Sequence, residues 1–222
     1  MSDSTLLSGI GYVRDTIPYD IFAQLTAEAS LAREKEIYVN SELAGAIKEE
    51  YNIGSSDFIL GEFFNYIVEL IGRYEQTFAG AIGTRQGMLS YPILRMENID
   101  RTSLISNWVN YQKKFEYNPP HKHSGLWSYV VWLDLPYNIE EEKEKYKSNT
   151  EFNFQYIAND GLIQQHSVDP KEGDIILFPA ELWHSVNPFF LSDDFRVSLS
   201  GNIFAVQPEE IIWKDKPVTK VI

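Results

Sequence analysis

Three of the four histidines in this chain occur in settings typical of metal ligands. His121 and His123 stand in the segment Asn-Pro-Pro-His-Lys-His, and His184 follows a strand-like run that ends in Phe-Pro. Side chains at i and i+2 of an extended chain lie on the same face, so His121 and His123 can point at one ion. Imidazole is a common ligand for Fe(II), which many oxygenases hold with two histidines and a carboxylate. The pattern therefore predicts a mononuclear metal site, with Fe(II) as the expected ion.

A basic residue with a hydroxyl close by follows further along the chain. Arg196 and Ser198 alternate on a predicted strand, so their side chains share one face. A guanidinium group can hold a carboxylate through two parallel hydrogen bonds. The pair therefore indicates a site for a carboxylate ligand. The alternative is a salt bridge from Arg196 to Asp193 or Asp194 at the rim of the strand.

The composition excludes several kinds of site. The chain has 222 residues and no cysteine, which rules out disulfides, thiolate zinc sites and a cysteine nucleophile. Its net charge of −13 argues against a nucleic-acid partner, which would require a basic surface. Because neither a secretory signal pattern nor a long apolar run is present, we expect a cytoplasmic protein with no membrane partner. His166 has no metal-site context, and we expect it to be structural.

The elements that must position these residues change in type along the chain. Apolar residues recur with a period near 3.6 between positions 58 and 79, which predicts a helix with one buried face. From about residue 83 the pattern alternates, which predicts strands. We therefore expect an α+β chain, with an N-terminal helical and mixed extension (1–82) and a β-barrel core (83–222) that form one structural unit. Further helices are expected at 21–35 and 41–50, a loop or short helix at 139–149, and strands at 87–96, 104–113, 128–135, 151–157, 162–168, 175–178, 185–187 and 196–206.

The order of these motifs resembles the Fe(II)- and 2-oxoglutarate (2OG)-dependent oxygenases. The order is His-x-His, Gly-Asp, Phe-Pro, Trp-His and Arg-x-Ser, and it covers roughly residues 88–206. More narrowly, Asn-Pro-Pro-His-x-His before a serine-containing strand is similar to a group of these oxygenases from phages and marine bacteria. The resemblance implies a double-stranded β-helix, a jelly-roll or cupin-like barrel, with N-terminal helices packed on one sheet.

The resemblance also implies roles for individual residues. His121 matches the first histidine of the proximal motif, and His184 matches the distal histidine. Arg196 matches the basic residue that binds the far carboxylate of 2OG, and Ser198 matches its hydroxyl helper. Residues expected to line the cofactor pocket from neighbouring strands are Asn110, Tyr111 and Ser128.

The metal ligand set departs from the usual family pattern, in which the proximal motif is His-x-Asp or His-x-Glu. Here the third position is His123, which leaves three accounts open. His121, His123 and His184 form a three-histidine site, which we favour. Alternatively, His123 and His184 bind the metal and Gly125 stands at the carboxylate position, or a carboxylate from elsewhere completes the site. No catalytic residue is expected beyond the metal centre.

If the resemblance holds, the protein is a 2OG-dependent non-haem iron dioxygenase. It would hydroxylate a small-molecule or peptide substrate while 2OG is decarboxylated to succinate. One alternative is a three-histidine cupin-type dioxygenase that does not use 2OG. Another is a non-catalytic barrel that serves as a binding module, although such a module has no reason to place Arg196 deep in the barrel. An exposed edge strand or the C-terminal arm could support a homodimer.

Overall fold

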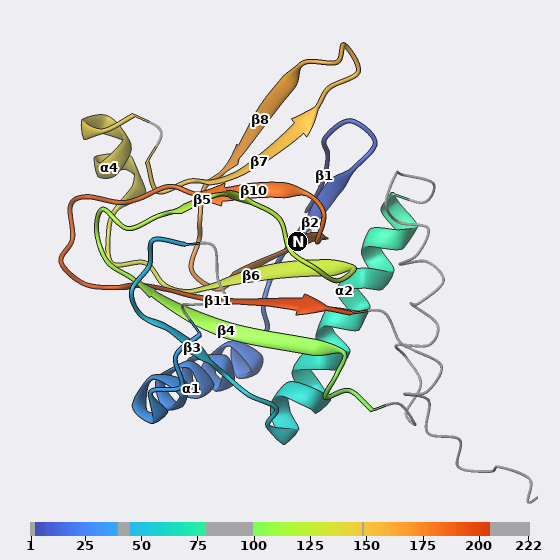
Figure 1. The fold of residues 1–222 in the computed structure, drawn as a ribbon, viewed down its shortest axis with the longest axis vertical. Coiled ribbons are helices and arrows are strands. Elements are labelled where there is room, and N and C mark those ends of the chain that lie inside the picture. The colour runs from blue at the N-terminus through green and yellow to red at the C-terminus, as the bar shows by residue number, and fades with distance from the viewer. Residues whose placement is uncertain (1–2, 40–44, 79–99, 148, 205–222) are drawn as a thin grey trace, which may run out of the picture.

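Two antiparallel β-sheets face each other in the computed structural model, which describes residues 3–39, 45–78, 100–147 and 149–204 (Figure 1). Within these residues the larger sheet has seven strands and the smaller sheet has four. The larger sheet runs in the order β1 (Asp3–Leu6), β2 (Gly11–Thr16), β9 (Asp174–Pro179), β6 (Trp127–Asp134), β11 (Arg196–Ile203), β4 (Ile105–Gln112) and β3 (Glu50–Asn52). The smaller sheet runs in the order β5 (Asn118–His121), β10 (Trp183–Val186), β7 (Phe152–Ile157) and β8 (Ile163–Val168).

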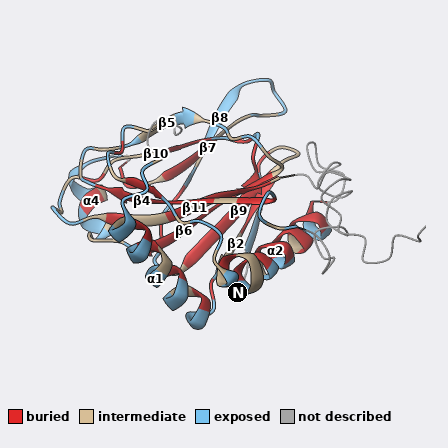
Figure 2. Ribbon diagram, turned by 60° about the horizontal axis from the view of Figure 1, so that its bottom comes forward, coloured by how far each residue is buried: buried red, intermediate tan, exposed pale blue. Residues whose placement is uncertain are grey.

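Two helical segments cover the outer face of the larger sheet (Figure 1). One is α1 (Tyr19–Lys35), and the other is a π-helical turn, η2 (Ile59–Phe63), that continues into α2 (Phe64–Thr77). Their inward faces are buried and their outward faces are exposed (Figure 2). The short helix α4 (Ile139–Lys145) lies at one end of the barrel. Among the described residues, no helix has the length and apolar character needed to cross a membrane.

Alternation along the strands divides the interior into two apolar clusters. On β6, Tyr129 and Val131 belong to the cluster between the larger sheet and the helices. Val130 and Trp132 belong to the cluster between the two sheets. The period of two in a strand explains this division, because neighbouring side chains point to opposite faces. β6 is therefore buried on both faces, as its nearly continuous apolar run predicted.

This arrangement is the double-stranded β-helix that the motif order implied. The predicted strands between residues 104 and 203 are all present, with ends that shift by one or two residues. The helices predicted at 21–35 and 58–79 and the short helix within 139–149 are also present. The strand predicted at 87–96 and the C-terminal arm lie outside the described residues.

The helix predicted at 41–50 is wrong over its described part. Residues 45–49 form bends and irregular backbone, and Glu50 begins β3. Long-range hydrogen bonds replace the helical ones, since Ala46 N–H donates to the Tyr117 carbonyl and Tyr111 N–H donates to the Glu49 carbonyl. Good helix formers thus take an irregular path because the edge of β4 offers partners for their backbone groups.

The N-terminal segment also contributes three strands that the pattern did not predict. β2 pairs with β9, β1 pairs with β2, and β3 pairs with β4. Residues before position 82 therefore complete both edges of the larger sheet. The division of the chain at residue 82 stays a prediction.

Candidate metal centre

Three histidines converge at one end of the space between the two sheets. His121 ends β5, His184 lies on β10, and the two are direct partners in the antiparallel ladder. His123 follows β5, and its N–H donates to the Ala180 carbonyl, which ties this segment to the end of β9. One nitrogen from each ring lies within 4.8 Å of the others. The sequence prediction that these side chains aim at one point is thus met in the geometry.

Backbone carbonyls orient two of the three rings. His121 Nδ1 lies 2.7 Å from the Pro119 carbonyl oxygen, and His184 Nδ1 lies 2.9 Å from the Leu182 carbonyl oxygen. A carbonyl oxygen can only accept, so each Nδ1 carries the proton and each Nε2 keeps its lone pair. Metal-binding histidines are commonly fixed in this way. Both rings therefore present Nε2 as the ligand atom.

Aromatic side chains pack against the rings of His123 and His184. The His184 ring stacks on Phe152 at 5.4 Å between centroids and meets Phe178 edge-on at 4.9 Å. Trp108 lies 5.4 Å from the His123 ring. Burial, followed by repulsion from His121 and His123, lowers the pKa of His184 well below its ordinary value. Burial, followed by repulsion from His121, lowers the pKa of His123 to about 4, so the rings are neutral at pH 7.

The described residues bear on the three accounts of the ligand set. The group that could hold an ion contains His121, His123 and His184, and among the described residues no carboxylate joins it. Gly125 has a φ of 103° and lies against β11, where an added Cβ would approach the Ile203 carbonyl oxygen to 2.9 Å. Glycine is therefore required at position 125 by its backbone and its close neighbour. The geometry favours three histidines.

The same interior space runs from the histidines to Arg196. One cavity is lined by His121, His123 and His184 at one end and by Arg196 and Ser198 further along; its other lining residues include Trp108, Asn110, Gln112, Asn118, Trp132, Phe152 and Ser200. Alternation on β11 places Arg196, Ser198 and Ser200 inside the barrel. The predicted metal ligands and the predicted carboxylate site therefore share a cavity.

Arg196 is only 1% exposed, although its guanidinium group is charged. It makes five hydrogen bonds, which match its five N–H groups. All the acceptors are neutral: the Gln112 side chain, the Tyr137 hydroxyl and the backbone carbonyls of Thr150 and Asn187. Asp193, the alternative partner, pairs instead with Lys114. Within the described part of the chain, the charge of Arg196 thus has no carboxylate beside it.

The other predicted lining residues differ in their placement. Asn110 faces the cavity, and its Nδ2 lies 3.4 Å from Ser198 Oγ and 3.3 Å from Ser200 Oγ. Ser128 lies on the interior face of β6, but its hydroxyl donates to Asn202 Oδ1 at 2.7 Å. The structure does not place Tyr111 in the cavity. Its ring packs on the helix side, over the Arg33 guanidinium and against Phe195. Adjacent residues of a strand face opposite sides, so Asn110 and Tyr111 cannot both point inward.

Several cavity residues were missed by the sequence interpretation. Gln112 and Asn118 are amides with no motif around them, and Trp108 and Trp132 resemble ordinary core aromatics. The alternation of β4 carried a usable signal, because Trp108 and Gln112 share the face of Asn110. His166, expected to be structural, lies away from the cluster, and its Nε2 lies 3.1 Å from the Tyr12 hydroxyl oxygen.

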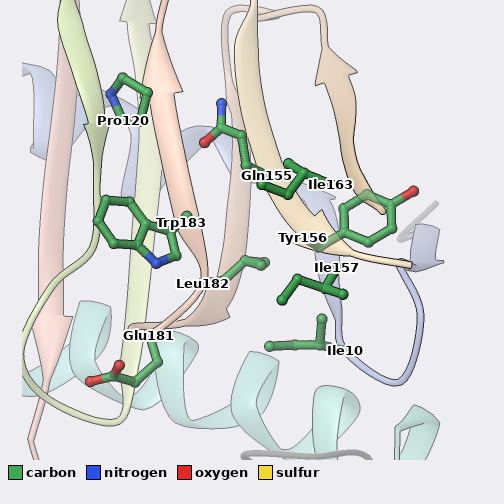
Figure 3. A pocket seen from close by; sticks show the side chains of 9 residues that line it. All are labelled: Ile10, Pro120, Gln155, Tyr156, Ile157, Ile163, Glu181, Leu182 and Trp183. Carbon is green, nitrogen blue, oxygen red and sulfur yellow. The ribbon is translucent and has the colours of Figure 1, made fainter. Parts of the chain in front are cut away.

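The outer face of the smaller sheet carries a separate apolar groove of about 550 Å³. Pro120 and Trp183 precede His121 and His184 in the chain, so alternation turns them to the opposite face. Figure 3 shows both residues beside this groove, with Leu182, Ile157 and Ile163. The groove is therefore distinct from the metal centre, although both use β5 and β10.

Comparison with known proteins agrees with this geometry. Residues 106–202 match the model of a family described as "Putative 2OG-Fe(II) oxygenase". The fold is similar to that of a Pseudomonas putida prolyl-4-hydroxylase, with a TM-score of 0.55 and 15% identity over 89% of this chain and 94% of that one. It is also similar to a prolyl hydroxylase from Trichoplax adhaerens, solved with a peptide of hypoxia inducible factor, with a TM-score of 0.52 and 12% identity over 87% of this chain and 83% of that one. No curated protein matches the sequence.

The matched segment contains the three clustered histidines and Arg196. The resemblance to the Fe(II)- and 2OG-dependent oxygenases is therefore confirmed, and so is the double-stranded β-helix fold. This family implies Fe(II) and 2OG as the cofactor and co-substrate.

Proposed function

We propose that this protein is an oxygenase that uses Fe(II) and 2OG to hydroxylate a small-molecule or peptide substrate. The observation that carries the proposal is the shared cavity, with three neutral histidines at one end and a buried guanidinium group further along. In the overall reaction, O₂ gives one oxygen atom to a C–H bond of the substrate and the other to succinate, while 2OG loses CO₂.

The donor set fits a divalent iron ion. Three imidazole nitrogens suit Fe(II) and leave coordination positions for other ligands. The carbonyls of Pro119 and Leu182 fix the rings of His121 and His184, so these ligands need no reorientation when the ion binds. Trp108 and Phe152 pack against the rings of His123 and His184 and give the centre an apolar wall.

Arg196 supports 2OG as the co-substrate. A charge this deeply buried is costly unless an opposite charge accompanies it. Its acceptors are neutral, so an incoming carboxylate would add the missing charge. Asn110 and Ser198 line the same part of the cavity and offer further polar contacts. Neither the cupin-type dioxygenase without 2OG nor the binding module accounts for this buried cation.

The test is the formation of succinate from 2OG by the iron-loaded protein in air. Wild-type protein should form succinate, whereas His184→Ala and Arg196→Ala should stay at the level of the iron-free protein. His166→Ala is the matched control, because it removes a histidine outside the cluster, and it should behave as wild type. Succinate formation by His184→Ala at the wild-type rate would contradict the proposed metal site. Iron binding without any succinate in the wild type would favour the cupin-type alternative.

A further inference from the structure

Gln112 occupies one edge of the Arg196 guanidinium group. Its Oε1 accepts from Arg196 Nε at 3.1 Å and from Nη2 at 2.5 Å. These two N–H groups point in parallel and form an edge that can bind a carboxylate through two hydrogen bonds. A single amide oxygen therefore stands where a carboxylate would make its paired contact.

Two of the other acceptors of Arg196 are backbone carbonyls, and both are held firmly in place. Thr150 and Asn187 accept through backbone carbonyls at 2.9 and 2.8 Å. The segments that carry them are joined to each other, since Thr150 N–H donates to the Pro188 carbonyl and Asn187 N–H donates to the Glu151 carbonyl. Moving either carbonyl would break these two hydrogen bonds. The Tyr137 hydroxyl accepts from Nη1 at 3.0 Å, away from the Nε–Nη2 edge, and its ring packs on Phe189. A side-chain amide needs only a rotation about its own bonds, so Gln112 is the acceptor that can most readily leave the Nε–Nη2 edge.

Gln112 is well placed to act in this way. It is the last residue of β4, it is 2% exposed, and it lines the cavity together with Arg196. Its Nε2 donates to the Glu116 carbonyl at 2.5 Å, which orients Oε1 toward the guanidinium group. An amide oxygen carries only a partial charge, so it satisfies the N–H groups without neutralising the cation.

We propose that Gln112 is a neutral stand-in for the far carboxylate of 2OG. Its side chain binds Arg196 when 2OG is absent and competes with the co-substrate for the guanidinium group. This inference rests on the proposed function, because it assumes that 2OG binds at Arg196. Gln112 then sets the affinity of the protein for 2OG. The Gln112 amide binds Arg196 through Oε1 and the Glu116 carbonyl through Nε2. Binding of 2OG therefore costs the two hydrogen bonds from Arg196 to Oε1.

The test compares the dissociation constant for 2OG in Gln112→Ala, Gln112→Glu and wild-type protein, measured by anaerobic titration of the Fe(II)-loaded forms. Gln112→Ala removes the competitor and should bind 2OG about fivefold or more tightly, given the strength of a hydrogen bond to a charged group. Gln112→Glu supplies a permanent carboxylate and should bind 2OG at least about tenfold more weakly. Fe(II) affinity should be unchanged in both variants. Gln164→Ala, an exposed glutamine on β8, is the matched control and should bind 2OG as wild type does.

The outcomes separate this inference from the proposed function. If wild-type protein does not bind 2OG, the proposed function fails. If wild-type protein binds 2OG but Gln112→Ala binds it equally or more weakly, Gln112 is not a competitor and only this inference is overturned. Unchanged affinity in Gln112→Glu would overturn it as well. Should Gln112→Glu not fold, Gln112→Ala and Gln112→Leu still decide the matter, with folding checked by thermal unfolding.

Discussion

His184 lies directly opposite His121 in the antiparallel pair of β10 and β5, and the centroids of their rings are 4.3 Å apart. The two strands thus bring one histidine each to the same point, and His123 approaches from the segment that follows β5. Among the described residues, the resulting cluster contains no carboxylate. Under the proposed function, a third imidazole takes the place that the usual motif of 2OG-dependent oxygenases gives to Asp or Glu.

The first prediction concerns His121, whose role the sequence left open. His121→Ala should weaken Fe(II) binding by more than the 10- to 100-fold typical of losing an outer contact to a ligand, because it removes a ligand itself. Anaerobic calorimetric titration with Fe(II) measures the effect. His166→Ala should bind Fe(II) with wild-type affinity. Equal affinity in His121→Ala would instead support a site held by His123 and His184.

The second prediction separates the charge of Arg196 from its shape. Arg196→Lys keeps the positive charge but cannot reach all of the acceptors that the planar guanidinium group serves. We expect 2OG to bind about tenfold or more weakly, while Fe(II) binds normally, because the histidines are untouched. Anaerobic titration of the metal-free variant with Fe(II), and then of the loaded variant with 2OG, gives the two dissociation constants. Normal 2OG affinity in this variant would show that charge alone suffices.

The third prediction concerns Glu142 on α4. Its partner Asn149 precedes Thr150, whose carbonyl accepts from Arg196. Glu142 is fully buried, and its carboxylate accepts from the N–H groups of Phe190 and Leu191 at 2.9 and 2.6 Å and from Asn149 Nδ2 at 2.5 Å. Glu142→Ala leaves these donors unpaired and should lower the free energy of unfolding by about 2–4 kcal/mol. Urea denaturation measures the change. Glu144→Ala, on the exposed face of the same helix, should change stability little. A similar loss of stability in both variants would argue against a stabilising role for the Glu142 hydrogen bonds.

The fourth prediction is a dependence of stability on pH that arises at Glu75. This side chain is 8% exposed, and within the described residues its carboxylate oxygens have no hydrogen-bond partner. Burial raises the pKa of Glu75 from 4.5 to about 7. Below pH 4.5 the group is protonated in both states. As the pH rises to 7 the unfolded chain ionises first, so the free energy of unfolding falls, and above pH 7 the loss is complete.

Glu75→Gln removes this titration. The difference in free energy of unfolding between the variant and wild type should be about 1–2 kcal/mol more favourable to the variant at pH 8 than at pH 5. This value is reduced for partial access of solvent to the carboxylate. Chemical denaturation at both pH values tests this expectation. Glu69→Gln, on the exposed side of the same helix, should show no such difference. A constant offset between Glu75→Gln and wild type at both pH values would contradict the assignment.

The sequence predicted the convergence of the three histidines because its signals are local. His121 and His123 are two residues apart, and His184 and Arg196 lie on strands with clear alternation. Tyr111 was misplaced because its place in the pocket was inferred from the predicted strand alone, which does not show which face of the strand points inward. Only the register of β4 against β11, in which Asn110 pairs with Ser198, decides which side chains point inward.

The parts that the sequence did not predict depend on contacts between distant residues. β3 has only three residues, and its conformation depends on pairing with β4. Ala46, Lys48 and Glu49 have good helix propensity, but long-range backbone hydrogen bonds of this segment to β4 and Tyr117 override it. Gln112 has no motif at all, and its contact with Arg196 becomes visible only when β4 and β11 are paired.

The most direct test of the central claim is an anaerobic titration of the protein with Fe(II) and then with 2OG, followed by visible absorption. The account predicts a metal-to-ligand charge-transfer band that requires both additions and that is lost in His184→Ala and in Arg196→Ala. Iron bound without a band would contradict chelation of 2OG at this centre. A band of full intensity in Arg196→Ala would contradict the assignment of Arg196 as the carboxylate site.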